Sequence, residues 1–243
     1  MFVWSPLDEK RFGLKTAKLS INSSCNNISE QLTIFKREQG RLFIVRCDTG
    51  LSDTIFKLQT VGFFTTDTML TFSISPDFLV KQDFKTNSSF EVVQAQEKDS
   101  DILASISRKA FAGYCGHYHN NPGLDKNHCD EVYVDWARNL VLNKSMADVV
   151  YMCRLKEFYT GFASLKVNAE GMAKAGLLGV VPSQKGKGIS RLLHQKRFQW
   201  CIDNGIKEIQ VETSINNKVY LNLLIGLGFK YVSAVQIFHL NNF

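Results

Sequence analysis

LLGVVPSQKGKGISRLL, residues 177–193, carries the clearest structural signal in this sequence. An apolar run ends at Pro182, a turn containing Gly186 and Gly188 follows, and apolar residues then recur at helical spacing from Ile189. Glycines at these two positions let successive backbone N–H groups converge on an anion. The N-terminus of the following helix adds further unpaired N–H groups and the positive end of its dipole. The segment therefore predicts a buried strand, an anion-binding turn and a helix.

Three cationic side chains, Lys185, Lys187 and Arg191, surround the same turn. Their charges and the glycines together favour a pyrophosphate as the anion. The turn lacks the longer loop ending in Gly-Lys-Ser/Thr of a P-loop and the third glycine of a dinucleotide-binding fingerprint. An ordinary strand–turn–helix connection, with glycines only for sharp turning, is the less favoured alternative.

Together with NKVYLNLLIGLGF at residues 217–229, this segment resembles the Gcn5-related N-acetyltransferase (GNAT) superfamily over about residues 90–240. The resemblance implies acyl-CoA as co-substrate, no metal, and a pyrophosphate site at residues 185–191. It also implies that the strand through Leu178 and Val180 hydrogen-bonds the pantetheine arm, in a V-shaped gap beside a strand at 207–212. The residues expected to bind the cofactor are Leu178, Gly179, Val180, Lys185, Gly186, Lys187, Gly188, Ile189, Ser190, Arg191, Asn217 and Tyr220.

The sequence departs from the superfamily pattern at two positions. Ser183 stands where the loop usually opens with Gln or Arg, which removes a side-chain contact and leaves the backbone cradle intact. Leu224 occupies the slot of the frequent general-acid tyrosine, seven residues after Asn217. Tyr220 lies one helical turn earlier, and its side chain leans toward the helix N-terminus, further from that slot. We therefore expect Tyr220 to pack against the cofactor or the core.

Without that tyrosine, the expected mechanism is direct attack of an amine on the thioester. The pKa of a sugar amine is close to that of an α-amino group, about 7.7–8.0, so an appreciable fraction of the amine is already uncharged at neutral pH. The reaction then needs orientation and an oxyanion donor more than a strong base. Val180 is expected to supply a backbone N–H to the oxyanion, and Glu212 is a weak base candidate. An acyl-cysteine intermediate is the alternative chemistry, and a catalytically degenerate acyl-CoA-binding module is the alternative function.

The N-terminal half contains a weak internal echo of the C-terminal end. Residues 39–72 and 204–238 both read as turn, strand, helix, Gly-Phe and strand. The strand at 42–45 matches 206–211, and the helix at 55–61 lies between the two strands of the first copy.

We expect a three-layer α+β fold of αβα type, with a mixed GNAT-type sheet and an N-terminal partial copy of the same fold. Polar residues at 77–89 divide it into domains 1–85 and 86–243. Elements expected in the second domain are a strand at 90–95, a helix at 99–111, a loop at 112–130, a helix at 131–142, strands at 148–155, 158–167 and 172–181, and a helix at 189–204.

The tandem arrangement and a run of spaced aromatic residues are similar to bacterial TDP-fucosamine acetyltransferases, enzymes of lipopolysaccharide O-antigen assembly. This second resemblance implies a nucleotide-linked amino sugar as acceptor. Aromatic faces suit a sugar or base ring, and imidazoles suit hydroxyl groups. The residues expected to bind the acceptor are Tyr114, His117, Tyr118, His119, Tyr133 and Trp136. A different small amine or a protein amine is the alternative acceptor.

Composition sets broader limits on the function. The 243 residues carry 29 Lys+Arg and 23 Asp+Glu, a net charge of +6, and are 44% hydrophobic, as in ordinary folded proteins. The basic residues are scattered, which disfavours a nucleic-acid polymer. The six cysteines lack a disulfide-scaffold spacing, and no signal-like or membrane-spanning run is visible, so a cytoplasmic protein with reduced thiols is expected.

The spacing of Cys115, His117 and His119 does not match that of a zinc site. His194 is expected in solvent and His239 in a strand, and a homodimer is one expected assembly.

Overall fold

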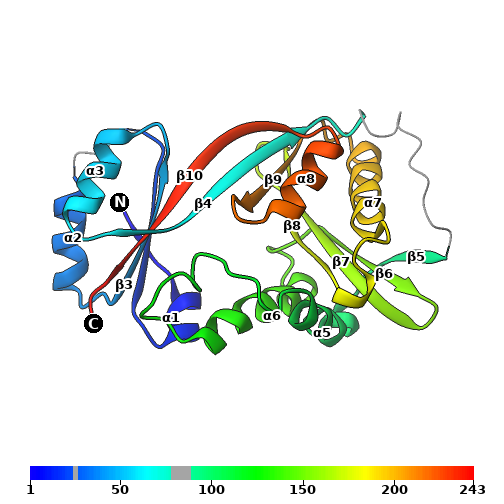
Figure 1. The fold of residues 1–243 in the computed structure, drawn as a ribbon, viewed down its shortest axis with the longest axis horizontal. Coiled ribbons are helices and arrows are strands. Elements are labelled where there is room, and N and C mark those ends of the chain that lie inside the picture. Colours follow the sequence, from blue (N-terminus) through cyan, green and yellow to red (C-terminus); the bar gives the residue numbers. More distant parts are fainter. Residues whose placement is uncertain (24–26, 78–88) are drawn as a thin grey trace.

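The computed structural model of the protein describes residues 1–23, 27–77 and 89–243. One mixed sheet runs through them in the order β1-β2-β3-β10-β4-β9-β8-β7-β6-β5 (Figure 1). Neighbouring strands are antiparallel except for the parallel pairs β2·β3 and β8·β9. The strands are β1 (Val3–Trp4), β2 (Thr16–Ile21), β3 (Leu42–Asp48), β4 (Phe64–Ile74), β5 (Phe90–Gln94), β6 (Val149–Leu155), β7 (Phe158–Val167), β8 (Ala173–Val180), β9 (Ile209–Ser214) and β10 (Lys230–Asn241).

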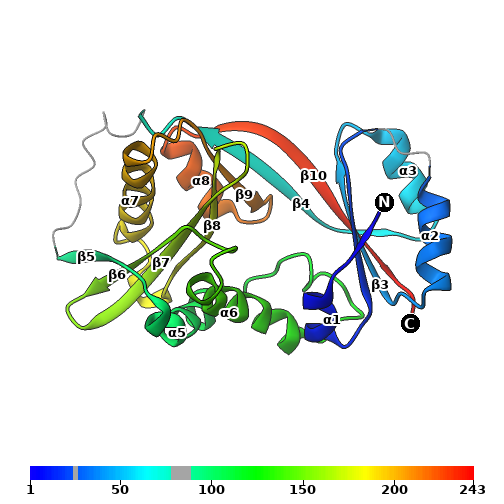
Figure 2. The same ribbon diagram turned by 180° about the vertical axis from the view of Figure 1, so that it is seen from behind.

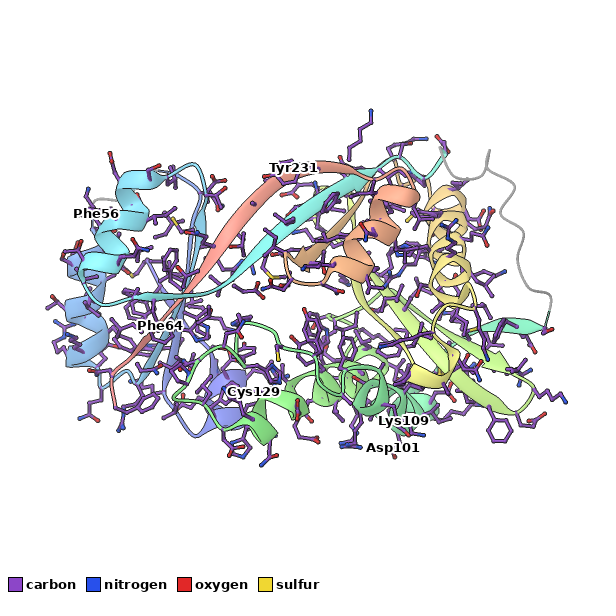
Figure 3. All side chains as sticks on the ribbon, viewed as in Figure 1. Phe56, Phe64, Asp101, Lys109, Cys129 and Tyr231 are labelled. Atoms are coloured by element: carbon purple, nitrogen blue, oxygen red, sulfur yellow. The ribbon has the colours of Figure 1, made fainter. Side chains whose placement is uncertain are left out.

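Helices cover both faces of this sheet, which confirms the expected α+β class. The helices are α1 (Pro6–Phe12), α2 (Ile28–Arg37), α3 (Ser52–Thr60), α5 (Ser100–Ala110), α6 (Lys126–Leu142), α7 (Ile189–Asp203) and α8 (Lys218–Gly226), with 3-10 turns η1 (Glu97–Asp99) and η2 (Pro182–Gln184). On β6, Met152 packs in the core below α5 and α6, whereas Cys153 packs with Leu193 of α7. Alternation of side chains along each strand thus separates the α5–α6 face from the α7–α8 face. Asp101 and Lys109 lie on the outer surface of α5 (Figure 3).

The two halves of the molecule repeat one unit, as the sequence echo predicted. Units β3-α3-β4 and β9-α8-β10 each place a glycine with positive φ after the helix, Gly62 at 98° and Gly228 at 88°. These backbone angles favour glycine, which ends each helix and redirects the chain into the next strand. The duplication is therefore structural.

The repeated units exchange their final strands. β10 lies between β3 and β4, and β4 in turn pairs with β9 (Figure 1). Phe238 of β10 is fully buried in the N-terminal core with Phe43 and Phe35. The long strands β4 and β10 therefore form the structural connection between the two lobes.

Several element boundaries differ from the sequence expectations. α6 begins at Lys126, five residues before the expected start, because the Asp125 side chain accepts a hydrogen bond from the His128 N–H and caps the helix. β9 begins at Ile209 rather than residue 206. The break expected at 77–89, and with it the division into 1–85 and 86–243, falls largely outside the described residues and stays a prediction.

The loop between α5 and α6 reaches back to the N-terminal lobe (Figure 2). Its Tyr118 hydroxyl donates to Asp8 Oδ1 of α1 at 2.9 Å, and Lys18 of β2 pairs with the same carboxylate. Burial is the largest single effect on Asp8 and raises its pKa. Lys18 and the hydrogen-bond donors around the carboxylate together outweigh it, so the pKa of Asp8 lies below its ordinary value. The loop therefore joins the two lobes on the α5–α6 side of the sheet.

Two further sequence expectations concern membranes and thiols. In the ranges 1–23, 27–77 and 89–243, no helix combines the length and apolar character needed to cross a bilayer. In these ranges Cys115, Cys129, Cys153 and Cys201 are free thiols, and Cys25 lies outside them.

Candidate acyl-CoA site and acceptor face

The parallel strands β8 and β9 pair at their beginnings and then part. Their register runs from Ala173 opposite Ile209 to Ala175 opposite Val211, whereas β8 continues to Val180 and β9 to Ser214. The diverging ends produce the V-shaped gap that the family resemblance implied between these two segments. The remaining length of β8 therefore has one edge available to a ligand.

A bulge decides which groups of β8 line that edge. Between Ala163 and Leu165 of β7 the opposing residues jump from Leu178 to Ala175, so β8 contains one extra residue. The Val181 N–H bonds Thr160 O of β7 at 2.9 Å. Because N–H groups alternate along a strand, those of Leu178 and Val180 point away from β7, toward the gap. This is the orientation that the expected pantetheine and oxyanion contacts require.

The turn after β8 exposes the predicted phosphate cradle. Gly186 and Gly188 have φ of 79° and 84°, and a Cβ on either would meet no heavy atom within 4 Å. Gly188 is the N-cap of α7, whose first four N–H groups lack partners within the helix. Lys185 and Lys187 are exposed beside it. The residues present therefore fit a pyrophosphate group.

α8 flanks the gap with Asn217 and Tyr220. The Asn217 side chain caps the helix by accepting from the Tyr220 N–H at 3.4 Å and donates to Thr213 Oγ1 of β9 at 3.3 Å. The Tyr220 hydroxyl lies 3.1 Å from His194 Nε2 of α7. Leu224 is fully buried in the core beneath. Tyr220 thus packs against the core, as expected.

His194 is buried, so its expected position in solvent is wrong. α8 covers this part of α7, and the His194 ring stacks on Phe198 and Tyr220. Arg197, one turn further, is also fully buried and donates to the carbonyls of Gly176 and Leu177 at 3.2 and 2.8 Å. These two residues belong to the bulge of β8. Arg197 therefore holds the bulge that turns the β8 amides toward the gap, a role that sequence analysis missed.

A sequence model described as the Acetyltransferase (GNAT) family matches residues 122–229, which include β8, the glycine turn and α8. This segment belongs to the GNAT acetyltransferase family. The protein is accordingly an acyl-CoA-dependent N-acetyltransferase, and CoA is its co-substrate.

Solved structures similar to the whole chain support the fold alone, because their sequence identities to it are low. A functionally unknown conserved protein from Staphylococcus epidermidis shares 9% identity at a TM-score of 0.67, over 94% of this chain and 85% of that one. A tandem GNAT protein from the clavulanic acid biosynthesis pathway shares 11% at 0.66, over 94% and 76%. A GCN5-related N-acetyltransferase from Sphaerobacter thermophilus shares 11% at 0.61, over 87% and 65%. No curated protein matches the sequence.

Three of the six expected acceptor residues, Tyr114, His119 and Tyr133, lie together. Tyr133 stacks on Phe111 at 4.8 Å between ring centroids, and Tyr114 and His119 approach the Tyr133 ring at 5.3 and 6.3 Å. These side chains form an aromatic cluster, defined here as Phe111, Tyr114, His119 and Tyr133. Burial raises the pKa of Tyr114 to about 12, so its hydroxyl stays neutral at physiological pH.

The remaining acceptor candidates have other surroundings. His117 Nδ1 lies 3.0 Å from His239 Nε2 of β10, so it contacts the strand shared by the lobes. Tyr118 is 7% exposed and uses its hydroxyl on Asp8, which gives it a packing role. Trp136 is exposed, and in the described residues no ring contact joins it to the aromatic cluster. The structure therefore brings together only part of the predicted acceptor set.

Glu212, the weak base candidate, is paired. It lies on β9 and forms an ion pair with Arg46 of β3. The Glu212 carboxylate is therefore already engaged by a cation. Asp67 of β4, which sequence analysis did not single out, lies one strand from the gap and bonds Ser214 at the end of β9.

Tyr220→Phe is expected to lower kcat less than tenfold, well below the roughly 10²–10⁴-fold loss of a general acid. Its hydroxyl is bound to His194, and its removal leaves that buried imidazole without its partner, at a cost of about 1–3 kcal/mol in unfolding free energy. Tyr231→Phe, on the exposed part of β10 (Figure 3), is the control and should change neither quantity. A hundredfold loss of kcat at unchanged stability would instead assign an acid role to Tyr220.

Three buried histidines predict acid sensitivity of the fold. Burial lowers the pKa of His239 to about 3 and holds those of His117 and His194 well below the ordinary value. The folded state therefore binds fewer protons than the unfolded chain below about pH 6.5. The unfolding free energy should fall by about 1.4 kcal/mol per pH unit for each histidine as the pH drops.

Urea unfolding at pH 7.5, 6.5 and 5.5 measures this loss. His194→Gln should reduce the dependence on pH, whereas His128→Gln, a change at an exposed histidine of α6, should leave it as it is. Constant stability over this range would show that the three imidazoles are not kept neutral by the fold.

Proposed function

We propose that the protein transfers an acyl group from acyl-CoA to the primary amine of a nucleotide-linked amino sugar, of the dTDP-linked aminodideoxy type. The observation that carries the acyl-transfer part is the gap between β8 and β9, which ends at the glycine turn of α7. On the opposite side of the sheet, the aromatic cluster offers ring faces.

In this reaction the amine nitrogen attacks the thioester carbonyl carbon, the new N–C bond forms and the C–S bond breaks. The Val180 N–H, which points into the gap, stabilises the oxygen as it becomes negative. The turn at 185–191 fixes the pyrophosphate, and the edge of β8 fixes the pantetheine, so the thioester is held in place for attack. The thiolate that leaves takes up a proton released by the amine and becomes free CoA.

The test measures free thiol from acetyl-CoA with a panel of amines: dTDP-linked aminodideoxyhexoses, spermidine, kanamycin and a lysine-containing peptide. We expect the highest kcat/KM with a sugar nucleotide. Turnover confined to the other amines would replace the proposed acceptor class while leaving the acetyltransferase activity intact. Comparing acetyl-CoA with 3-hydroxybutanoyl-CoA decides whether the donor carries a longer acyl group.

The remaining parts of the proposal concern the biological setting. A sugar-nucleotide acceptor places the enzyme in O-antigen and lipopolysaccharide assembly, at a cytoplasmic site, with the nucleotide-linked sugar as partner. A homodimer is the proposed assembly. Sedimentation of the purified protein tests it directly.

A further inference from the structure

Asp67 is a buried carboxylate with one oxygen fixed and the other unpartnered. Its Oδ1 accepts hydrogen bonds from Ser214 Oγ and from the Thr68 N–H, both at 2.8 Å. Its Oδ2 has no hydrogen-bond partner in the described part of the chain, and the residue is only 5% exposed. A buried polar atom without a partner is costly to the fold, so it points to a ligand.

Asp67 lies on the face of the sheet from which the acceptor amine is expected to approach. Ile209 and Val211 of β9 pack in the core with α7 and α8. Because successive side chains of a strand point to opposite faces, Ser214 faces the α5–α6 side. Asp67 bonds Ser214 on that face, one strand from the gap between β8 and β9. An amine held by Asp67 therefore approaches the gap from the face opposite α7 and α8.

The groups that surround Asp67 leave it as an unpaired anion. Met69 and Ile237 on its own sheet face pack in an apolar cluster with Tyr133. Burial is the main cause of the raised pKa values of Tyr114 and Tyr133, and the charge of Asp67 raises both further. Nearby carboxylates are already paired, Glu212 with Arg46, Asp8 with Lys18 and Asp130 with His119. In the described residues, no ion pair supplies a cation to Asp67.

We propose that Asp67 binds the amino group of the acceptor and takes its proton during acyl transfer. An ammonium group supplies the cation that this carboxylate lacks, and its N–H donates to the unpartnered Oδ2. The inference rests on the acyltransferase activity and not on which amine is the acceptor. It also gives the N-terminal lobe a direct part in the reaction.

The proton accounting is complete with groups already named. The ammonium nitrogen loses one proton to Asp67 Oδ2 and becomes the nucleophile. Attack on the thioester carbon forms an N–C bond, expels the thiolate and releases a second proton from the nitrogen. One proton neutralises the thiolate as CoA thiol, and the other passes to solvent when Asp67 returns to its charged form. Burial raises the pKa of Asp67 above its ordinary value, which improves it as a proton acceptor.

Asp67→Asn tests the role, because the amide keeps the shape and can still accept from Ser214. With the fastest amine of the panel used above, kcat/KM should fall at least a hundredfold, and the Kd of acetyl-CoA should stay within twofold. The deficit should shrink as the pH rises above the pKa of the amine, because the variant can use only amine that is already uncharged. A purely structural role for Asp67 does not produce that pH dependence.

Two more variants keep the result interpretable. Ser214→Ala leaves the carboxylate but removes one of the two donors to Oδ1, so a three- to tenfold loss of kcat/KM is expected even if Asp67→Asn folds poorly. Asp53→Asn, the same change on an exposed first-turn residue of α3, should have no effect. If Asp67→Asn and Ser214→Ala both stay within threefold of the wild type on the fastest amine, Asp67 is not the base. If the sugar nucleotide is not that amine, only the proposed acceptor class fails.

Discussion

Gly188→Glu is expected to abolish acyl-CoA binding, with the Kd of acetyl-CoA raised at least a hundredfold in calorimetric titration. Gly188 caps α7 at φ 84°, and the space where its Cβ would stand is open. A glutamate there would be strained in the left-handed region and would place a carboxylate in the cradle. The carboxylate occupies the anion position at the helix N-terminus and repels the pyrophosphate. Gly186→Glu should behave in the same way.

Gly171→Glu is the matched control for strain and charge. Gly171 lies in the exposed turn between β7 and β8 with φ 79°, and its Cβ would also meet no atom within 4 Å. This variant carries the same backbone cost and the same charge away from the cradle, so its affinity for acetyl-CoA should equal that of the wild type. Unchanged affinity in Gly188→Glu would mean that the pyrophosphate lies elsewhere.

Removing residues 1–85 is expected to yield an insoluble or inactive fragment. The deletion takes away β3 and β4, the two neighbours of β10, and leaves β9 without its antiparallel partner. Phe238 and Leu240 lose the core that buries them, at roughly 1.5–3 kcal/mol for each large side chain. Bare strand edges then favour aggregation. Soluble yield and thiol release from acetyl-CoA measure the outcome.

Co-expression provides the control for this deletion. Supplying residues 1–85 as a separate chain should restore soluble protein, because the missing strands can still pair with β10. A fragment 86–243 that is soluble and fully active alone would show that the N-terminal lobe is dispensable, and it would also contradict the role proposed for Asp67.

The sequence predicted the elements correctly wherever a local residue pattern alone determines the element. The alternation in β7, the glycine turn before α7 and the Gly-Phe pairs all produced elements close to their expected bounds. The start of α6 was missed because its first turn is polar, and the Asp125 cap that defines it is one residue among several polar ones. Exchange of β10 between β3 and β4 has no local signal, since it depends on pairing between distant segments.

In the functional site, too, local features were predictable from the sequence and features that depend on distant segments were not. The phosphate cradle is a local feature of backbone and glycine, so its residues could be named from the sequence. His194 and Arg197 stand among polar neighbours on α7, and they are buried by distant parts of the chain, His194 by Tyr220 of α8 and Arg197 by the bulge of β8. Asp67 reads as a polar interruption in TTDTML, residues 65–70. Its burial depends on β9, β10 and the loop before α6, which come from three other parts of the chain.

The place of β10 also orders events during protein synthesis. Val45 of β3 pairs with Phe238 of β10, so the strands on either side of β10 leave the ribosome long before it. Until then β3 and β4 present open edges with an apolar core between them, and contacts of such long sequence separation form slowly. The N-terminal lobe, although translated first, is therefore expected to finish folding last and to depend on chaperones that shield β-strand edges in the nascent chain.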